Sequence, residues 1–316
     1  MDKELNIVFL DASTVGKVDV ISKIEALGSF KSYETTTPEQ CIERIRGNNV
    51  VIVNKVYIDK DIMDNCPEIE LICVTATGVN NIDLEYASKK NIVVKNVAGY
   101  STESVAQTTF SMLFYLLNKI PYFDNYVKSG KYTKSPIFTN HDRTFWEVKG
   151  KQFGIIGLGT IGKRVASIAE AFGARVVYHS TSGKNLNNPY DHLSLEELLN
   201  TSDIISIHCP LNEDTFNLIG YGEISMMKSH SILLNTGRGN IVNDAALADA
   251  LNDNIIAAAG IDVLSHEPIL ENNPLLKVNN QEKILITPHI AWISDEARTK
   301  LIEGVYNNIK EWTMSC

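Results

Sequence analysis

The stretch Gly154-Ile155-Ile156-Gly157-Leu158-Gly159-Thr160-Ile161-Gly162 decides the fold, because it places the pattern GxGxxG between a strand-like run and a helix-like run. A short apolar run precedes it, and the apolar residues after it recur at helical spacing. In such a turn Gly157 permits a tight bend, Gly159 lets the backbone approach a pyrophosphate, and Gly162 lets the helix pack closely on the strand. The N–H groups and the dipole at the start of the helix favour the anion. The stretch therefore predicts a dinucleotide site.

Short apolar runs alternate with helix-like stretches on both sides of this turn. The apolar runs cover residues 5–11, 50–53, 70–74 and 91–94 before the turn, and residues 152–156, 174–178, 203–207, 231–235 and 256–262 from the turn onward. Such alternation predicts parallel sheets with helices on both faces. Because 316 residues suffice for two cores, we expect an α/β protein with two doubly wound, parallel-sheet domains in tandem.

The composition argues against several classes of partner. The net charge is -9 and the isoelectric point is about 5.3, whereas a nucleic-acid partner needs clustered Lys and Arg. The apolar run at residues 5–10 is too short for a membrane span or for the core of a signal peptide. The cysteines form no CxxC pair, and no His or Cys spacing predicts a metal site. We therefore expect a soluble, cytoplasmic protein without nucleic-acid, membrane or metal partners, whose thiols are buried: Cys41, Cys66, Cys73, Cys209 and Cys316.

The residue that usually reads the adenosine ribose is an Asp or Glu about 20 residues beyond the glycine turn, at the end of the second strand. In this chain that position is Ser180. A carboxylate binds the ribose diol of NAD and repels the 2′-phosphate of NADP, so its absence removes the repulsion without adding an attractive arginine. The hydroxyls of Ser180, Thr181 and Ser182, together with Lys184, suit either a phosphate or an ordinary polar loop. The sequence predicts NAD(H) or NADP(H) and favours NAD slightly.

Three polar side chains follow predicted strands in the second half of the chain. Arg238 lies between two glycines, Glu267 follows the run at 256–262, and His289 follows the last strand. A guanidinium is a planar, bidentate clamp for a carboxylate. A histidine that titrates near neutral pH can give a proton to a ketone oxygen as hydride arrives, and a neighbouring carboxylate keeps it protonated. One such residue alone is usually structural, but the three together predict hydride transfer to or from a small 2-keto or 2-hydroxy acid.

A segment without a clear place in either domain lies between the two series. Residues 103–117 are apolar on nearly all sides, and residues 121–149 form a polar and aromatic stretch that we expect to be irregular. A helix that is apolar all round is normally buried, and a long irregular segment is uncommon unless it has a function. A subunit interface explains both features, and so does a linker packed against its own chain.

Several stretches resemble signatures of the D-isomer-specific 2-hydroxyacid dehydrogenases, and the resemblance spans essentially the whole chain. Besides the motifs above they are Thr75-Ala-Thr-Gly-Val-Asn-Asn-Ile-Asp83, Asn96-Val-Ala-Gly-Tyr-Ser-Thr-Glu-Ser-Val-Ala-Gln107 and Trp146-Glu-Val-Lys-Gly-Lys151. Three shorter stretches resemble the glycerate dehydrogenase (hydroxypyruvate reductase) branch in particular: Asn54-Lys-Val56, Tyr100-Ser-Thr102 and His289-Ile-Ala-Trp292. The family's common acid is replaced by Ser180, which bears on the coenzyme and leaves the chemistry untouched.

The resemblance implies a flavodoxin-like substrate domain at residues 1–100 and 288–316, and a Rossmann coenzyme domain at residues 101–287. It also implies a homodimer formed through the helix and arm at residues 103–149. In this family pattern His289 is the proton donor and acceptor, Glu267 is its partner, and Arg238 binds the substrate carboxylate and carbonyl.

Further contacts are implied by the same resemblance. Asp262 would hold the nicotinamide carboxamide. The other implied coenzyme contacts are Thr77, Gly157, Gly159, Thr160, Ile161, Gly162, Ser180, Cys209, Pro210, Thr236, Gly237 and His289. The implied substrate contacts are Lys55, Thr77, Gly78, Val79, Tyr100, Arg238 and Trp292.

We therefore expect an NAD(P)-dependent reductase of hydroxypyruvate and glyoxylate. Specificity depends on a few pocket side chains, so D-lactate or another D-2-hydroxyacid is the alternative substrate. A protein of another class, an NAD-sensing binding protein like the corepressors that share this fold, is less expected. Such a protein would not need the three catalytic candidates.

Overall fold

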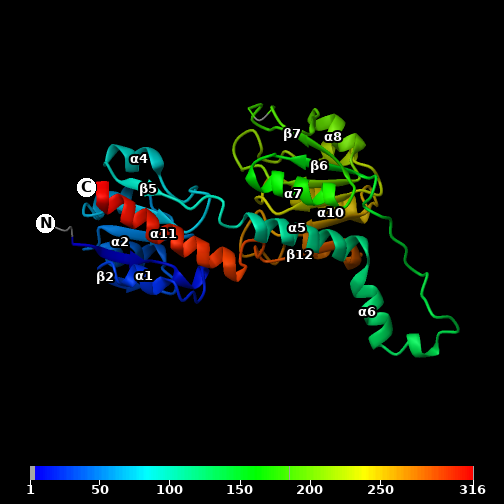
Figure 1. Cartoon of the computed structure of the whole chain (residues 1–316), viewed down its shortest axis with the longest axis horizontal. Coiled ribbons are helices and arrows are strands. Elements are labelled where there is room, and N and C mark those ends of the chain that lie inside the picture. The colour runs from blue at the N-terminus through cyan, green and yellow to red at the C-terminus, as the bar shows by residue number, and fades with distance from the viewer. Residues whose placement is uncertain (1–3, 185, 316) are drawn as a thin grey trace. The chain divides into compact units, whose positions relative to one another are not determined.

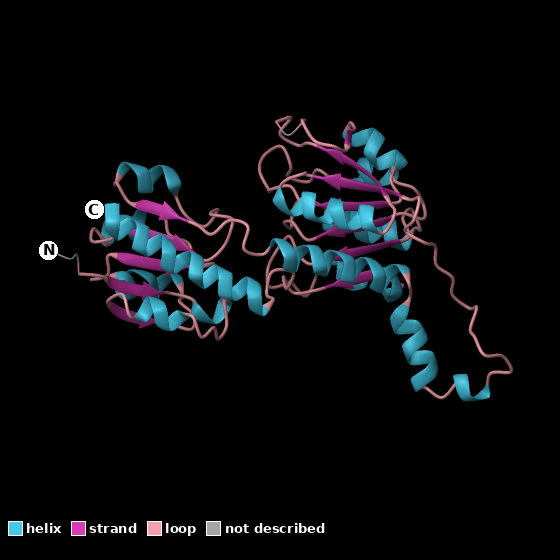
Figure 2. Ribbon diagram, in the orientation of Figure 1, coloured by secondary structure: helices cyan, strands magenta, loops and turns pink. Residues whose placement is uncertain are grey.

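The computed structural model describes residues 4–184 and 186–315, and the chain divides into two compact units. The first unit comprises Met1–Ser101 and Trp292–Cys316, and the second comprises Thr102–Ala291. Each unit holds one parallel sheet with helices on both faces (Figure 2), so the predicted fold class is confirmed. Cys316 lies outside the described residues, and the other four cysteines are buried free thiols, as expected.

The sheet of the first unit has five parallel strands in the order β2-β1-β3-β4-β5. These strands are β1 (Asn6–Phe9), β2 (Ser29–Ser32), β3 (Val50–Val53), β4 (Leu71–Val74) and β5 (Val93–Lys95). The helices are α1 (Ile21–Glu25), α2 (Pro38–Ile45), α3 (Lys60–Asn65), α4 (Leu84–Lys89) and α11 (Asp295–Ser315), with a 3-10 turn η1 (Ala12–Thr14) after β1. Helix α11, red in Figure 1, thus returns the end of the chain to the first unit.

Alternating side chains of the central strands supply two apolar cores in the first unit. In β1, Val8 packs in one core while Ile7 and Phe9 pack in the other. Every residue of β3 and β4 is buried. Successive side chains of a strand point to opposite faces, so a strand covered on both faces is apolar throughout. On one face the cover comes from the apolar side of α11, through Leu301, Ile302, Val305, Ile309 and Trp312.

The sheet of the second unit has seven parallel strands in the order β12-β11-β10-β9-β6-β7-β8. These strands are β6 (Gln152–Ile156), β7 (Arg175–His179), β8 (Asp191–His192), β9 (Ile204–Ile207), β10 (Ile232–Asn235), β11 (Ala258–Ile261) and β12 (Ile284–Ile286). After β6 the chain adds β7 on one side and then β9 on the other, so the strand order reverses at β6. Open α/β sheets bind ligands at such a switch point.

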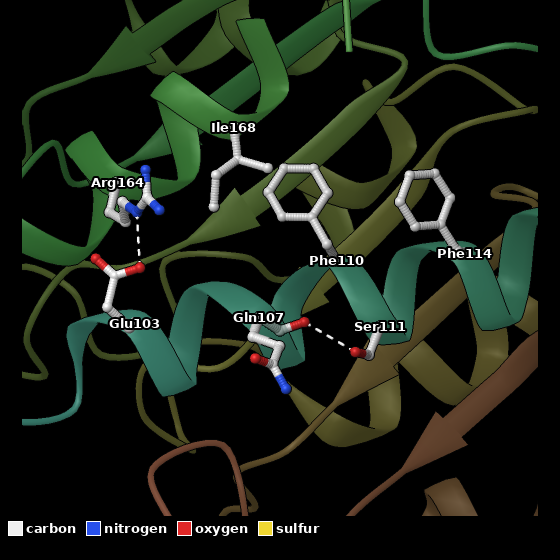
Figure 3. Close-up of a pocket in the computed structure, with 7 residues that line it drawn as sticks. All are labelled: Glu103, Gln107, Phe110, Ser111, Phe114, Arg164 and Ile168. Carbon is white, nitrogen blue, oxygen red and sulfur yellow. Dashed lines mark hydrogen bonds and ion pairs between the residues drawn. The ribbon is translucent and has the colours of Figure 1, made fainter. Parts of the chain in front are cut away.

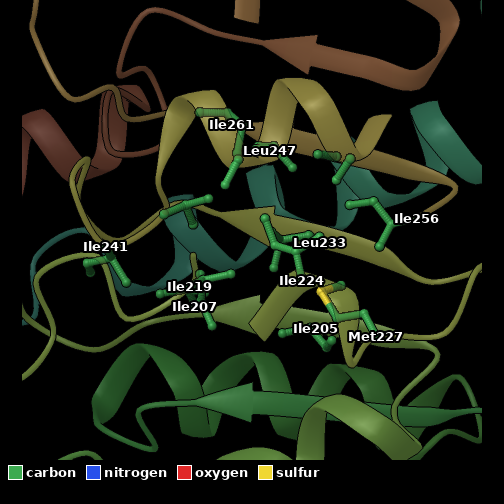
Figure 4. Close-up of a cluster of buried hydrophobic side chains, with 14 of the residues drawn as sticks. Ile205, Ile207, Ile219, Ile224, Met227, Leu233, Ile241, Leu247, Ile256 and Ile261 are labelled. Atoms are coloured by element: carbon green, nitrogen blue, oxygen red, sulfur yellow. The ribbon is translucent and has the colours of Figure 1, made fainter. Parts of the chain in front are cut away.

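Helices cover both faces of this second sheet. They are α5 (Thr102–Leu117), α7 (Thr160–Ala171), α8 (Leu195–Thr201), α9 (Tyr221–Ser225) and α10 (Asp244–Asn252), with 3-10 turns η3 (Pro274–Lys277) and η4 (Gln281–Lys283). Side chains of α8, α9 and α10 pack on one face of the sheet in the core that Figure 4 shows. Side chains of α5 and α7 pack on the other face. Because the seven strands of this sheet are parallel, their C-terminal ends share one edge.

The first part of the segment that follows α5 is helical, which the sequence analysis did not predict. Residues 121–149 were expected to be irregular, but α6 (Ile120–Lys128) is a helix, and a 3-10 turn η2 (Tyr132–Lys134) comes after it. Proline is tolerated in the first turn of a helix, where its missing N–H is not needed, so Pro121 does not prevent α6 from forming. Figure 1 shows α6 leaving the α/β body of the second unit.

Within residues 4–184 and 186–315, no helix has both the length and the apolar content that crossing a membrane requires.

Candidate active site

The glycine turn after β6 has the geometry of a pyrophosphate cradle. Gly157 has a φ of +93°, and a Cβ there would lie 2.5 Å from the backbone nitrogen of Cys209. A Cβ on Gly162 would lie 2.3 Å from the carbonyl oxygen of Gly157, whereas one on Gly159 would meet no atom within 4 Å. Gly159 is also the N-cap of α7, and within the described part of the chain no side chain caps this helix. The open space at Gly159 and the unpaired N–H groups of the first helical turn fit a bound phosphate.

The loop after β7 contains the position that usually reads the adenosine ribose. Strand β7 ends at His179, and Ser180 follows it with a buried side chain. Ser182 and Lys184 lie in the same loop, where the Lys184 N–H donates to Ser182 Oγ at 3.4 Å. A hydroxyl therefore stands where a carboxylate would select for NAD.

The loop after β9 contains a histidine that the sequence analysis did not single out. The Nε2 of His208 lies 2.8 Å from Ser206 Oγ, and burial lowers the pKa of His208 to about 3. It is therefore neutral at physiological pH and adds no positive charge next to Cys209. The following residue, Pro210, accepts a hydrogen bond from Thr215 Oγ1 at 2.7 Å through its carbonyl oxygen.

The turn that carries Arg238 follows β10 and is fixed from two sides. Within it, Asn235 Nδ2 donates to the carbonyl oxygen of Arg238 at 2.9 Å, and the Gly237 N–H donates to Asn235 Oδ1 at 3.1 Å. A Cβ on Gly239 would lie 1.8 Å from the carbonyl oxygen of Leu264. The Arg238 turn is thus packed directly against the segment that leads to Glu267.

Glu267 and His289 form a hydrogen-bonded pair. His289 Nδ1 lies 2.8 Å from Glu267 Oε2, and the other oxygen of Glu267 accepts from the Leu264 N–H at 3.1 Å. The side chain of His289 is 24% exposed and that of Glu267 is 33% exposed, so both are partly accessible to solvent. A carboxylate accepts a hydrogen bond only from a protonated nitrogen, so Nδ1 carries a hydrogen and Nε2 is the ring nitrogen outside this pair.

Asp262 holds the turn that presents His289. Its carboxylate accepts hydrogen bonds from Thr287 Oγ1 at 2.6 Å, from the Ile290 N–H at 2.8 Å and from the Ala291 N–H at 2.9 Å. Burial raises the pKa of Asp262 above its ordinary value, and these donors oppose that rise. His289 has a φ of +56°, a conformation that the surrounding bonds impose, and its N–H donates to the Asp262 carbonyl oxygen at 2.8 Å.

The other candidates belong to the first unit, and two of them follow its central strands. Lys55 follows β3 and the segment 77–79 follows β4. Asp11 organises the first of these loops, because its buried carboxylate accepts from the Asn54 N–H at 2.8 Å and from the Lys55 N–H at 2.6 Å. Tyr100 and Trp292 contact each other edge to face, with their ring centroids 6.2 Å apart.

The structure therefore places the predicted residues in two groups. The second unit brings together Arg238, Glu267, His289 and Asp262 through the contacts above, and it contains the glycine turn at the same sheet edge. The first unit contains Lys55, residues 77–79, Tyr100 and Trp292. Sequence reasoning missed Asp11, Asn235 and His208. The short spacing Asn235-x-x-Arg238 is typical of a side chain that bonds to its own turn, so it could have indicated Asn235.

A pocket of about 400 Å³ in the second unit lies apart from these candidates. Figure 3 shows it between α5 and α7, with Phe110, Phe114 and Ile168 as its apolar part. At its rim Arg164 Nε lies 2.9 Å from Glu103 Oε2. None of its lining residues was predicted to bind coenzyme or substrate.

Comparisons with known proteins cover almost the entire chain. Residues 110–291 match the sequence model of the family described as D-isomer specific 2-hydroxyacid dehydrogenase, NAD binding domain. A putative 2-hydroxyacid dehydrogenase of Haemophilus influenzae is 36% identical over 313 residues, covering 98% of both chains. A hydroxypyruvate reductase of Blautia hydrogenotrophica is 36% identical, covering 98% of this chain and 97% of the relative. A glycerate dehydrogenase of Methylorubrum extorquens is 35% identical, covering 96% and 95%.

Solved structures with the same fold include complexes with either nicotinamide coenzyme. An acyclic imino acid reductase in complex with NADPH and D-Arg is 30% identical, with a TM-score of 0.88 and 98% of both chains covered. A D-lactate dehydrogenase from Aquifex aeolicus, complexed with NAD and lactic acid, is 28% identical, with a TM-score of 0.85 and 98% and 96% covered. The similarity thus includes both units of the chain.

Proposed function

Because this chain belongs to the D-isomer specific 2-hydroxyacid dehydrogenases, we propose that it reduces hydroxypyruvate to D-glycerate and glyoxylate to glycolate. It is an NAD(P)-dependent oxidoreductase that acts on a CH–OH group. The observation that carries the proposal is the His289–Glu267 pair, held beside the Arg238 turn at the edge that also contains the glycine turn. The names of the Blautia and Methylorubrum relatives support hydroxypyruvate as a substrate, and a relative from Aeropyrum pernix named glyoxylate reductase supports glyoxylate.

The proposed chemistry needs one hydride and one proton. A nicotinamide coenzyme held at the glycine turn of the second unit would supply the hydride for the carbonyl carbon of the 2-keto acid. His289 gives its Nε2 proton to the carbonyl oxygen, and the Glu267 carboxylate stabilises the imidazolium from Nδ1. Arg238 binds the carboxylate and polarises the carbonyl, which orients the substrate and stabilises the charge that develops on oxygen. In the oxidative direction His289 takes the hydroxyl proton.

We assign the coenzyme to the second unit. The N–H groups at the start of α7 face the open space at Gly159 and suit the pyrophosphate. The buried carboxylate of Asp262 is proposed to accept from the nicotinamide carboxamide. The other proposed contacts remain Thr77, Gly157, Thr160, Ile161, Gly162, Ser180, Cys209, Pro210, Thr236, Gly237 and His289. The hydroxyl at Ser180 accommodates NAD and NADP, and we retain the slight preference for NAD.

We assign the substrate to residues of the first unit together with Arg238. The N–H groups of residues 77–79 are proposed to bind the substrate carboxylate, and Lys55, Tyr100 and Trp292 to contact the rest of this small polar acid. In this proposal residues 1–100 and 288–316 form the substrate domain, and residues 101–287 form the coenzyme domain. We further propose that the enzyme works in the cytoplasm.

A panel of short 2-keto acids tests the proposed activity. We expect the purified protein to oxidise NADH or NADPH with hydroxypyruvate and glyoxylate, each at a higher kcat/KM than with pyruvate or a branched 2-keto acid. Running the panel once with each coenzyme measures the preference that depends on Ser180. Faster reduction of pyruvate would favour the D-lactate alternative. No turnover of any panel member with either coenzyme would overturn the proposed function.

A homodimer is proposed to form through residues 103–149. This region supplies the α5 side of the pocket of Figure 3, and it contains the side chain of Phe138, which is 89% exposed. Burying such side chains against a second copy removes apolar surface from water. The segment beyond α6 exposes further apolar side chains, namely Ile137 and Phe145.

Light scattering on a sizing column tests the dimer. We expect a mass of about 70 kDa, twice the 35.1 kDa of one chain, and a shift towards the single-chain mass for Phe138→Asp. Phe216→Asp is the matched control, because Phe216 is also an exposed phenylalanine but lies outside residues 103–149. A single-chain mass for the unmodified protein, or equal shifts for the two variants, would contradict the proposed interface.

A further inference from the structure

The segment that follows β4 is fixed by hydrogen bonds to the chain around residue 97. The Val97 N–H donates to the carbonyl oxygen of Ala76 at 3.1 Å, and Thr77 Oγ1 donates to the carbonyl oxygen of Val97 at 3.3 Å. Asn96 Nδ2 donates to the carbonyl oxygen of Thr77 at 2.6 Å. The carbonyl of Thr77 therefore has a defined direction, set by a side chain from another loop.

The orientation of this carbonyl also sets the orientation of the next N–H. A trans peptide is planar, and its C=O and N–H point to opposite sides of the chain. Because Asn96 holds the Thr77 oxygen on its own side, the Gly78 N–H points away from Asn96. Among the residues that the structure describes, the N–H groups of Thr77, Gly78 and Val79 donate to no backbone or side-chain acceptor.

The neighbouring loop shows the opposite arrangement. After β3, three consecutive N–H groups converge on one carboxylate, that of Asp11, at distances of 2.8 Å from Asn54, 2.6 Å from Lys55 and 3.2 Å from Val56. An internal anion already occupies that set of donors. Of these two loops at adjacent strand ends, the one at residues 77–79 is the loop whose N–H groups are available to an external carboxylate.

Asn96 is itself held in place by the C-terminal helix. Asn308 Nδ2 in α11 donates to the carbonyl oxygen of Asn96 at 2.9 Å. One residue earlier, Lys95 Nζ forms an ion pair with Glu311 Oε2 of the same helix at 2.9 Å. The backbone carbonyl of Asn96 and the side chain of Lys95 are therefore both bonded to α11, so the Asn96 side chain starts from a backbone that is held in place.

We propose that Asn96 is a positioning residue that aims the Gly78 N–H at the substrate carboxylate by holding the carbonyl oxygen of Thr77. The inference rests on the proposed function, in which the backbone at residues 77–79 binds that carboxylate. Asn96 donates to protein and not to substrate in this role. Its loss weakens the binding of a carboxylate and leaves the coenzyme contacts of the second unit unchanged.

The test compares Asn96→Ala and Asn96→Asp with a matched control. We expect the KM for hydroxypyruvate and the inhibition constant of oxamate, an unreactive 2-keto acid analogue, to rise together by about 5- to 10-fold in Asn96→Ala. Asn96→Asp is expected to raise both further, because it sets a carboxylate against the Thr77 oxygen. The coenzyme dissociation constant and the urea midpoint are expected to stay near wild type. Asn65→Ala is the control, because Asn65 Nδ2 is exposed and donates to the Asp61 carbonyl oxygen at 2.8 Å in the same unit.

Two outcomes would overturn the inference. One is an unchanged KM and oxamate inhibition constant in both Asn96 variants. The other is a loss of coenzyme affinity and stability in parallel with the KM effect, which would show a general structural role. If the wild type reduces no 2-keto acid, the proposed function fails separately. In that case calorimetric titration of oxamate into the coenzyme-bound protein decides the inference: weaker binding to Asn96→Ala supports it, and equal binding overturns it.

Discussion

Replacing His289 with alanine is expected to lower kcat for hydroxypyruvate by about 100- to 10,000-fold, the usual contribution of a positioned general acid. Glu267 holds Nδ1 at 2.8 Å, so Nε2 is the atom that delivers the proton, and alanine removes it. His289 has a φ of +56°, where asparagine is better tolerated than alanine, so His289→Asn separates lost chemistry from backbone strain. The measurement is kcat at saturating substrate and saturating coenzyme, together with a coenzyme titration that measures separately what His289 contributes to coenzyme binding.

His230 offers a matched control for this substitution. Its Nε2 lies 2.8 Å from Asp203 Oδ1, the same separation as in the His289–Glu267 pair. Asp203 and His230 precede β9 and β10, so their pair lies at the amino ends of the strands, at the opposite edge of the sheet. We expect His230→Ala to leave kcat within about twofold of wild type. If both His289 variants keep more than about a tenth of the wild-type kcat, His289 is not the proton donor.

The glycine turn and the strand-end residues could be predicted because their signals are local. The GxGxxG spacing predicts where the backbone needs a residue without a Cβ. The structure confirms the close approaches at Gly157 and Gly162. The convergence of Arg238, Glu267 and His289 followed from a rule of geometry, since the carboxyl ends of parallel strands meet at one edge. Both arguments need only the order of strands and helices.

Two strands escaped prediction because burial, and not propensity, reveals a strand in this fold. Strands β3 and β4 are buried on both faces and appear as continuous apolar runs. The edge strand β2 has the mostly exposed sequence Ser-Phe-Lys-Ser, and β8 is a two-residue Asp-His strand. Neither presents an apolar run or a clear alternation, so no pattern separates them from loops.

The residues that position the site could not be predicted from local patterns. Asp11 bonds to a loop more than 40 residues away, and Asn96 bonds to a carbonyl 19 residues before it. Such partners become visible only when the strand order is known. They are polar residues in loops, which composition alone assigns to solvent. The structure shows that they decide which N–H groups of each loop remain available.

The substitution Arg238→Lys keeps the charge and is still expected to lower kcat/KM by about 100-fold. A charge-assisted hydrogen bond contributes about 1.5–3 kcal/mol, and lysine cannot present two parallel donors to a carboxylate as a guanidinium does. The turn cannot shift to compensate. Asn235 bonds to both sides of it, and Gly239 packs against Leu264 with no room for a side chain.

Arg175→Lys is the control for the change of residue type, because Arg175 forms an exposed ion pair with Asp191 at 3.2 Å and begins β7 at the amino end. We expect this variant to match the wild type. The split between KM and kcat then locates the contact of Arg238. A rise in KM alone means that Arg238 binds the carboxylate equally in the ground and transition states. An additional fall in kcat means that it also stabilises the charge on the carbonyl oxygen, and an unchanged kcat/KM would remove Arg238 from the proposed site.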